Sequence, residues 1–475
     1  MAALIRCWGK VACVGFDTFL IASKSSSNRF VRCGSSSSAI QDFLQLSQRG
    51  LCESVFPDTR LPDLEDLLSR SQSLYCGFDP TADSLHIGNL LSLIVLLHGQ
   101  RAGHSPIAVI GGATAMIGDP SGKTNDRVAI VAEEVENNVL AIMENIQRVV
   151  TNHRELLGKE ERQLPEFRIL NNNSWYKNRD VISFLASIGR HFRVGDMMAR
   201  HSVKSRLNSK EGLSCTEFLY QIFQAYDWLH LFEQYNCTLQ VGGNDQTGNV
   251  SSGFDLIRKV HKKYVFGLMV PLMLSSSGEK LGKSAGNSMW LSPSKTSPYE
   301  LYQYFFNTQD NEVERYLQLF TFLSFDEIAA VLQEQNEHPD QRPGQKKLAE
   351  QITLLVHGNA GLDSARRCTD VLFGNSMAAL TSMKLPELLQ LLKDAPTTEL
   401  VYDPQLTVCE MCLKIKCFKE ESAAMKIIRE GGLYINQQRV TQQSQTLGSA
   451  EYVLPSDITL VRVGKKTYHI VKWCR

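Results

Sequence analysis

From about Ser73 onward, short apolar segments alternate with segments of helical periodicity. Residues 73–78 are predicted as a buried strand, 106–110 as a second apolar strand and 167–170 as a third strand, and a further strand ends at 241–243. Helices are predicted from about 86 to 102, from 133 to 151 and from near 248, because apolar side chains recur there at helical spacing. Strands that alternate with helices form a parallel, doubly wound sheet, which binds ligands at the carboxyl ends of its strands. The alternation therefore predicts an α/β domain with a ligand site at that edge.

Two further regions follow this domain. The stretch from about 298 to 392 has a mostly helical pattern, with a polar linker near 335–345. A compact unit begins after 397–403, and residues 401–475 hold 11 Lys and Arg against 7 Asp and Glu, a local net charge of +4. The whole chain balances 50 basic against 50 acidic residues, so only a local basic face of this kind could attract nucleic acid.

The first forty residues differ from the rest in composition. They contain five basic residues, one acidic residue and eight serines. This composition is typical of an organellar transit peptide, and we predict residues 1–40 to be a mitochondrial one that directs the protein to the matrix. No apolar run approaches the roughly 18 residues of a membrane span, so a membrane partner is not expected. Twelve scattered cysteines favour reduced thiols in an intracellular compartment.

Two short motifs indicate nucleotide chemistry. His86-Ile-Gly-Asn89 stands at the predicted start of a helix, where free backbone N–H groups and the helix dipole favour phosphate. Lys280-Leu-Gly-Lys-Ser284 follows a Ser/Gly stretch, and its two lysines could neutralise charge that develops on pyrophosphate. Each motif alone is weak, because a helix-cap histidine and a solvated basic loop are commoner. Together, in this order, they resemble the two signatures of class I aminoacyl-tRNA synthetases.

The segments between the signatures resemble tyrosyl-tRNA synthetases, from about Phe56 to the C-terminus. They are 75–88, 111–114 with 118–123, Tyr220-x3-Gln224-x2-Asp227, and 240–246. Residues 192–195 and 270–272 are similar to the mitochondrial members of that family in animals. The resemblance implies a Rossmann-type catalytic domain, ATP and L-tyrosine as substrates, and tRNA(Tyr) as the acceptor.

A site that recognises a phenolic hydroxyl needs a buried hydrogen-bond acceptor and a buried donor. The resemblance assigns these roles to Asp227 and Tyr75. It also implies that Asp119, Tyr220 and Gln224 bind the ammonium group of the substrate. Tyr220, Gln224 and Asp227 fall at i, i+4 and i+7, on one helix face. A plain alternative makes Tyr75 a core aromatic and Asp227 a surface acid.

The resemblance also implies an ATP site. It places Cys76 and Asp245 at the ribose, Asp79 and Gly243 around the adenosine, and Thr81 with His86 at the terminal phosphates. Gly77, Gly88 and Ser284 belong to the same site, Leu272 and Met273 border the adenine, and Gln246 lies near the reacting carboxylate. Lys123 and Arg127 match a second loop that holds pyrophosphate, although a solvated basic turn is an equal alternative. Asn89 stands where a second histidine is usual, and it can still donate a hydrogen bond to the ribose.

The implied mechanism needs no side-chain acid or base. The tyrosine carboxylate attacks the α-phosphorus, pyrophosphate leaves, and a terminal ribose hydroxyl of tRNA then takes the tyrosyl group. Catalysis is positioning and electrostatic stabilisation by residues that include His86, Lys280 and Lys283. Mg²⁺ is expected to accompany ATP through phosphate oxygens, without a dedicated protein metal site.

The predicted organisation has four parts. Residues 1–40 are the transit peptide, and 41–290 the catalytic domain, with a dimer-forming helical insertion at about 172–215. Residues 291–396 form a helical anticodon-binding domain, and 397–475 a small α+β RNA-binding domain. The family is homodimeric, so a homodimer is expected. Cys409 and Cys412 lack a second ligand pair, which favours apolar packing over metal binding.

Three other functions are alternatives. A tryptophanyl-tRNA synthetase has a closely similar fold, but its substrate has no phenol for Asp227 to bind. A small-acid nucleotidyltransferase would not need the C-terminal regions. An RNA-binding scaffold without catalysis would not need Lys280 and Lys283.

Overall fold

The computed structural model describes residues 46–475 except 123–129, 157–162, 273–282, 285–286, 374–376, 384, 394, 419, 443–444, 449–451, 465–466 and 475. It describes the backbone alone at 283, 284 and 287. The predicted transit peptide therefore lies outside the described residues. No helix in the described part of the chain is both long enough and apolar enough to cross a bilayer.

A six-stranded sheet forms the centre of the α/β part of the chain. Its strands are β1 (Ser54–Phe56), β2 (Ser73–Phe78), β3 (Ser105–Ile110), β4 (Arg168–Asn171), β5 (Cys237–Gly243) and β6 (Phe266–Val270), in the spatial order β1-β6-β5-β2-β3-β4. Strands β2 to β6 are parallel, and β1 runs antiparallel to β6 at one edge. The chain proceeds outward from β2 in one direction and then returns to β5 on the other side, so the strand order reverses between β2 and β5. A doubly wound sheet binds its ligand at this position.

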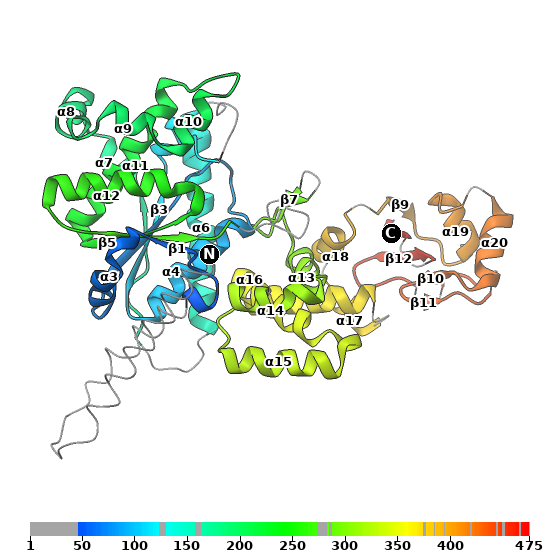
Figure 1. Cartoon of the computed structure of the whole chain (residues 1–475). Coiled ribbons are helices and arrows are strands. Elements are labelled where there is room, and N and C mark those ends of the chain that lie inside the picture. The colour runs from blue at the N-terminus through cyan, green and yellow to red at the C-terminus, as the bar shows by residue number, and fades with distance from the viewer. Residues whose placement is uncertain are drawn as a thin grey trace, which may run out of the picture. The chain divides into compact units, whose positions relative to one another are not determined.

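Helices cover both faces of the sheet. They are α3 (Leu61–Leu68), α4 (Ile87–Arg101), α5 (Thr114–Ile117), α6 (Ala132–Leu156), α11 (Cys215–Tyr235) and α12 (Thr247–His261). Figure 1 shows α11 and α12 on one face and α4 on the other. Leu90, Leu93, Ile94 and Leu97 of α4 are fully buried against the strands. The predicted strands and helices of this region are confirmed, whereas β1 and β6 had not been predicted.

The segment between β4 and α11 consists of short helices. These are α7 (Asn173–Tyr176), α8 (Val181–Ser187), α9 (Val194–Met198) and α10 (His201–Leu207). A buried ion pair ties the segment to the domain, because Arg206 Nη2 lies 2.9 Å from Glu217 Oε2 of α11.

A run of helices follows the α/β part. It comprises α13 (Pro298–Phe306), α14 (Asp310–Phe320), α15 (Phe325–Glu337), α16 (Pro343–Leu372), α17 (Met377–Ser382) and α18 (Leu385–Leu391). The break between α15 and α16 is shorter than the predicted polar linker. Gly358 kinks α16, with φ of +69° and ψ of −174°, a conformation that only glycine adopts readily.

The C-terminal part is a five-stranded sheet with two helices. Its elements are β9 (Thr397–Val401), α19 (Val408–Lys414), α20 (Glu421–Glu430), β10 (Leu433–Ile435), β11 (Gln438–Arg439), β12 (Ile458–Val463) and β13 (Thr467–Cys474), with strand order β11-β10-β12-β13-β9. One apolar cluster joins Val461 and Val471 of the sheet to Met411 of α19. A second joins Leu460 and Ile470 to Leu380 and Leu388 of α17 and α18.

Candidate active site

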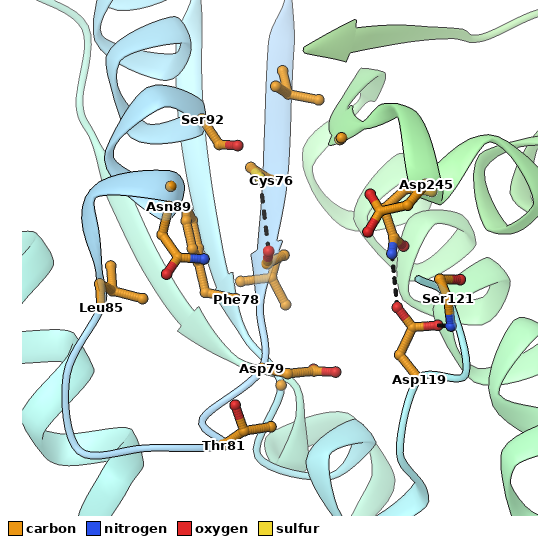
Figure 2. Close-up of a pocket in the computed structure, with 18 of the residues that line it drawn as sticks. Cys76, Phe78, Asp79, Thr81, Leu85, Asn89, Ser92, Asp119, Ser121 and Asp245 are labelled. Carbon is orange, nitrogen blue, oxygen red and sulfur yellow. Dashed lines mark hydrogen bonds between the residues drawn. The ribbon is translucent and has the colours of Figure 1, made fainter. Parts of the chain in front are cut away.

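A cavity of about 500 Å³ lies at the carboxyl ends of the parallel strands. Residues that follow each of the five strands line it: Asp79 after β2, Gly111 after β3, Asn172 after β4, Asp245 after β5 and Leu272 after β6. Figure 2 shows the part of this cavity between β2, the start of α4 and the turn after β5. The cavity is therefore where the strand alternation predicted a ligand site.

Asp227 and Tyr75 are buried residues of the lining, with exposed fractions of 5% and 2%. Asp227 Oδ1 accepts hydrogen bonds from Trp175 Nε1 and the Tyr176 hydroxyl, each at 2.8 Å. Asp227 Oδ2 accepts one from Asn172 Nδ2 at 3.1 Å. Burial raises the pKa of Asp227 to about 7, although these three donors oppose the rise.

The Tyr75 hydroxyl is buried without a hydrogen-bond partner among the described residues. Burial, with the Asp227 charge as a second cause, raises the pKa of Tyr75 well above its usual value, so the hydroxyl keeps its proton. A buried hydroxyl without a partner is unfavourable. A ligand group that both accepts and donates hydrogen bonds would satisfy this end of the cavity.

A chain of hydrogen bonds connects Asp227 with Asp79. Asn172 Nδ2 also donates to Thr114 Oγ1 at 3.0 Å, and Thr114 Oγ1 donates to Asp79 Oδ1 at 2.8 Å. Asp79 Oδ2 accepts from the Tyr220 hydroxyl at 2.8 Å. A Cβ atom at Gly111 would lie 2.0 Å from Asp79 Oδ1, so the turn after β3 requires glycine. Asp79, predicted beside the adenosine, thus directly contacts Tyr220, which was predicted at the substrate ammonium.

Asp119 is the centre of a second buried group. Its carboxylate accepts hydrogen bonds from Gln246 Nε2 at 2.7 Å and from the Ser121 N–H at 3.0 Å. Asn249 Nδ2 lies 3.3 Å from Asp119 Oδ1 and 3.1 Å from Gln246 Oε1. Figure 2 shows Asp119 and Asp245 on the same side of the cavity. Carboxylates at Asp79 and Asp119 make this part of the cavity suitable for a cationic group such as an ammonium.

The N-terminus of α4 forms another part of the lining. His86 is the residue before the helix, with extended backbone, and Asn89 Oδ1 accepts the His86 N–H at 3.1 Å. A Cβ atom at Gly88 would lie 2.8 Å from His86 Cε1, so glycine leaves space for the imidazole. Asn89 therefore caps the helix through its oxygen, and its amide group remains the possible donor to a ligand. Positive helix-dipole charge at this position favours phosphate.

The residues predicted to contact the ribose and adenosine lie on β2 and after β5. Cys76 is buried, and burial raises the pKa of its thiol to about 12. Gly77 is exposed to the cavity, with no atom within 4 Å of a Cβ built there. A Cβ atom at Gly243 would lie 2.6 Å from Asp245 Oδ1. This wall thus has room for a flat ligand against backbone.

The structure brings together every predicted site residue whose side chain it describes. These residues are Tyr75, Cys76, Gly77, Asp79, Thr81, His86, Gly88, Asn89, Asp119, Tyr220, Gln224, Asp227, Gly243, Asp245, Gln246 and Leu272. Lys123, Arg127, Met273 and Lys280 lie outside the described residues. Lys283 and Ser284 are described as the backbone of β7 (Lys283–Ser284), which pairs with β8 (Asn287–Ser288). Among the described residues, no group of three His, Cys, Asp or Glu side chains could hold a metal ion.

Sequence reasoning missed the partners of the buried carboxylates. Asn172, Trp175 and Tyr176 contact Asp227, Thr114 contacts Asp79, and Asn249 contacts Asp119. One signal could have found Asn172, since it follows a predicted strand directly and strand ends meet at the ligand site. No pattern in the sequence connects Trp175 or Tyr176 with a residue about fifty positions later.

The sheet is doubly wound, and the cavity at its switch point is lined by carboxylates and by a helix N-terminus. This combination is typical of nucleotide-binding domains of the class that activates small acids. The family model described as "tRNA synthetases class I (W and Y)" matches residues 68–374, and "Tyrosine--tRNA ligase SYY-like C-terminal domain" matches residues 387–471. The chain belongs to the tyrosyl-tRNA synthetases of class I.

Individual relatives agree with this assignment. The mitochondrial tyrosine–tRNA ligase of Drosophila melanogaster is 46% identical over 438 residues, which cover 91% of this chain and 94% of the relative. The mitochondrial enzyme of Homo sapiens is 46% identical over 431 residues, 90% of each chain. A C-terminally truncated mitochondrial tyrosyl-tRNA synthetase of Aspergillus nidulans superposes with a TM-score of 0.63 at 31% identity, covering 70% of this chain and 93% of that one.

Proposed function

We propose that the described cavity binds L-tyrosine and ATP together, forms tyrosyl-adenylate, and transfers tyrosine to the 3′ end of tRNA(Tyr). The observation that carries this proposal is the buried Asp227–Tyr75 pair at one end of the cavity. An anionic acceptor and an unpartnered phenol that both face the cavity suit a ligand hydroxyl which donates to one and accepts from the other.

The phenol of the substrate lies between Asp227 and Tyr75 in this proposal. Phenylalanine would leave the Tyr75 hydroxyl without a partner and the Asp227 carboxylate one donor short. The substrate ammonium lies beside Asp119, Tyr220 and Gln224. Asp79 fixes the Tyr220 hydroxyl and adds negative charge near the ammonium.

ATP occupies the wall formed by β2, the start of α4 and the turn after β5. Cys76 and Asp245 contact the ribose, Gly77 and Gly243 leave space for the nucleoside, and Leu272 and Met273 border the adenine. Thr81, His86, Gly88 and Asn89 place the phosphates at the positive end of the α4 dipole.

The first step is an in-line displacement at the α-phosphorus. A carboxylate oxygen of tyrosine forms the new P–O bond, and the bond to the β-phosphate oxygen breaks to release pyrophosphate. Gln246, which is held by Asp119, lies near the reacting carboxylate. Lys280 and Lys283, together with Lys123 and Arg127 of the second motif, neutralise charge on pyrophosphate, and Ser284 follows Lys283 directly in the first motif. Mg²⁺ would be bound mainly by phosphate oxygens, as is usual for this ion.

In the second step a ribose hydroxyl of the terminal tRNA nucleotide attacks the tyrosyl carbonyl, and AMP leaves. We assign residues 291–396 to anticodon binding and residues 397–475, which include a basic excess, to a further RNA contact. The basic, serine-rich residues 1–40 are proposed to direct the chain to the mitochondrial matrix, which is supported by its similarity to mitochondrial tyrosine–tRNA ligases.

A homodimer is proposed to form through residues 172–215. Helices α8 to α10 expose apolar side chains to solvent: Val181, Ile182, Leu185, Val194, Met198 and Leu207. Exposed apolar side chains concentrated in one segment are typical of a protein interface.

The test is amino-acid-dependent exchange of pyrophosphate into ATP, measured with tyrosine, phenylalanine and tryptophan. Exchange is expected with tyrosine. Discrimination against phenylalanine by about 10⁵ is the value known for tyrosyl-tRNA synthetases and is adopted from them. Asp227→Asn is expected to lower kcat/KM for tyrosine about ten- to hundred-fold, because it removes a charged acceptor.

Asp66→Asn is the matched control, since Asp66 is an exposed aspartate on α3. It should leave exchange unchanged. If exchange occurred with tryptophan alone, tryptophan and not tyrosine would be the substrate. A folded protein that binds RNA but exchanges with none of the three amino acids would refute the enzymatic proposal and favour an RNA-binding scaffold.

A further inference from the structure

Helix α6 carries three buried asparagines at a constant spacing of seven residues: Asn138, Asn145 and Asn152, with exposed fractions of 5%, 3% and 9%. Seven residues make almost two helical turns, so the three side chains lie along one side of the helix, and fourteen residues span about 21 Å. The other buried residues of α6 are mostly apolar, including Val135, Val139, Ile142, Ile146 and Val149. Asparagine is a poor helix former, and its buried amide must find partners, so packing alone does not explain the series.

The first two asparagines contact the loop that connects β2 with α4. Asn138 Nδ2 donates to the Pro80 carbonyl at 3.1 Å, directly before Thr81. The Ser84 hydroxyl lies 3.0 Å from Asn145 Oδ1, and Ser84 Oγ in turn accepts the Ser292 N–H at 3.0 Å. Thr81 and Ser84 both line the cavity. Asn138 and Asn145 therefore fix the loop that leads to the N-terminus of α4.

The third asparagine contacts the helical region instead. Asn152 Nδ2 donates to the Leu355 carbonyl of α16 at 3.1 Å. This carbonyl lies three residues before the kink at Gly358, where the backbone leaves the helical conformation. A Cβ atom at Gly358 would lie 2.9 Å from Asn152 Oδ1, so the glycine also allows the asparagine to approach.

Arg148 connects the same two regions from the adjacent turn of α6. Its Nε donates to the Val356 carbonyl of α16 at 3.1 Å, and its Nη2 donates to the Leu291 carbonyl at 2.8 Å. Leu291 belongs to the segment that follows β8 and pairs with the start of α4, since the Leu291 N–H donates to the Leu85 carbonyl at 2.8 Å. Helix α6 therefore contacts three regions. They are the loop between β2 and α4, the segment after the lysine motif, and the kink of α16.

We propose that α6 is a positioning helix that fixes the phosphate-binding segments of the cavity relative to the kink of α16, through Asn138, Asn145, Arg148 and Asn152. The inference rests on the proposed function, because it assigns these segments to ATP phosphates. None of the four is a catalytic residue. Their effect on the reaction is to hold Thr81 and the start of α4 where the triphosphate must lie, and errors of about 1 Å there can lower a rate about a hundred-fold.

The test replaces Asn152 by leucine in the full-length protein and measures tyrosine-dependent pyrophosphate exchange. Asn152→Leu removes the donor and keeps the volume, at a position that does not line the cavity. We expect kcat to fall about ten-fold or more, while KM for tyrosine stays within about two-fold. Val149→Ala is the matched control, because it opens a cavity in the same helix without removing a polar contact. It should lower Tm and leave kcat unchanged.

A double variant sharpens the test. If α6 links the two regions in series, Asn145→Leu with Asn152→Leu should lose no more activity than the worse single variant, whereas independent sites would multiply their losses. Arg148→Met provides the same test if Asn152→Leu does not fold. The proposal is overturned if kcat of Asn152→Leu equals that of Val149→Ala, or if the two losses multiply. Absence of exchange by the unsubstituted protein would instead overturn the proposed function and this inference with it.

Discussion

Asp227 illustrates how a single buried carboxylate can be held ready for a ligand. Three protein donors surround it, yet burial still raises its pKa to about 7. The donors favour the charged form and desolvation favours the neutral form, and desolvation is the larger effect. A tyrosine phenol would supply one more donor and favour the charged form further.

The raised pKa of Asp227 predicts a pH-dependent stability in the ligand-free protein. The folded protein binds this proton more tightly than the unfolded chain, whose aspartate has a pKa of 3.8. The group therefore stabilises the fold fully below pH of about 4, and its contribution, on the order of 4 kcal/mol, is lost as pH rises to about 7. The Asp227→Asn protein should not lose this contribution to its free energy of unfolding as the pH rises. Urea unfolding midpoints of both proteins at acidic and neutral pH measure it, and parallel pH profiles would contradict the prediction.

Two glycines of the cavity are expected to respond differently to the same substitution. Gly111→Ala would force Asp79 and Thr114 apart, lowering stability by about 1–3 kcal/mol and exchange activity about a hundred-fold. Gly77→Ala meets no protein atom, so it should fold normally and raise KM for ATP by occupying ligand space. Thermal unfolding and steady-state kinetics distinguish the two. Equal stability losses would show that the close approach at Gly111 does not constrain the fold.

At the residue scale, the sequence predicted the groups that face the ligand better than the groups that support them. Asp227, Tyr75 and Asp119 belong to motifs with fixed spacing, which a family resemblance can identify. Trp175 and Tyr176 lie on a short helix without periodicity of its own, and their contact with Asp227 depends on how β4 and α11 pack. Such contacts are set by tertiary structure and leave no local signal.

At the scale of elements, the contact between α10 and α11 depends on the buried ion pair of Arg206 and Glu217. Side-chain exposed fractions are 0% for Arg206 and 4% for Glu217. Glu217→Gln leaves a buried guanidinium with less compensation and should destabilise the protein by about 3–5 kcal/mol. Asp66→Asn breaks an ion pair whose partners are 78% and 72% exposed, and should cost less than about 1 kcal/mol. Chemical denaturation compares them, and similar losses would contradict the prediction.

The regular elements were the most predictable part of the fold. Residues 73–78 and 87–101 match their predicted strand and helix closely, because their apolar residues have a clear period. Strand β1 has three residues and pairs antiparallel with β6 at the sheet edge, so it is too short to show a pattern. The kink in α16 could not be predicted either, since a glycine inside a helical pattern is usually tolerated there and nothing in the sequence distinguishes Gly358 from Gly361.

At the scale of the whole molecule, the exposed apolar residues of α8 to α10 predict the oligomeric state. Ile182 is 70% exposed. Ile182→Asp should shift a dimer of the chain toward monomers, because a charge would be buried in the proposed interface. Leu140→Asp, which changes an exposed leucine of α6, is the control and should leave the dimer intact. Sedimentation of the three proteins measures this, and a monomeric unsubstituted protein would refute the proposed interface.

The C-terminal sheet has apolar contacts on both sides, with α19 through one cluster and with α17 and α18 through the other. This arrangement has a consequence for synthesis on the ribosome. Helices α17 and α18 are translated before the strand β13 that covers them, by about 80 residues. At typical rates this delay lasts roughly 4 to 16 seconds, and Leu380 and Leu388 lack Leu460 and Ile470 as partners until β12 and then β13 are synthesised. A chaperone that binds nascent apolar helices would find its target in this interval, and the last strand to emerge would release it.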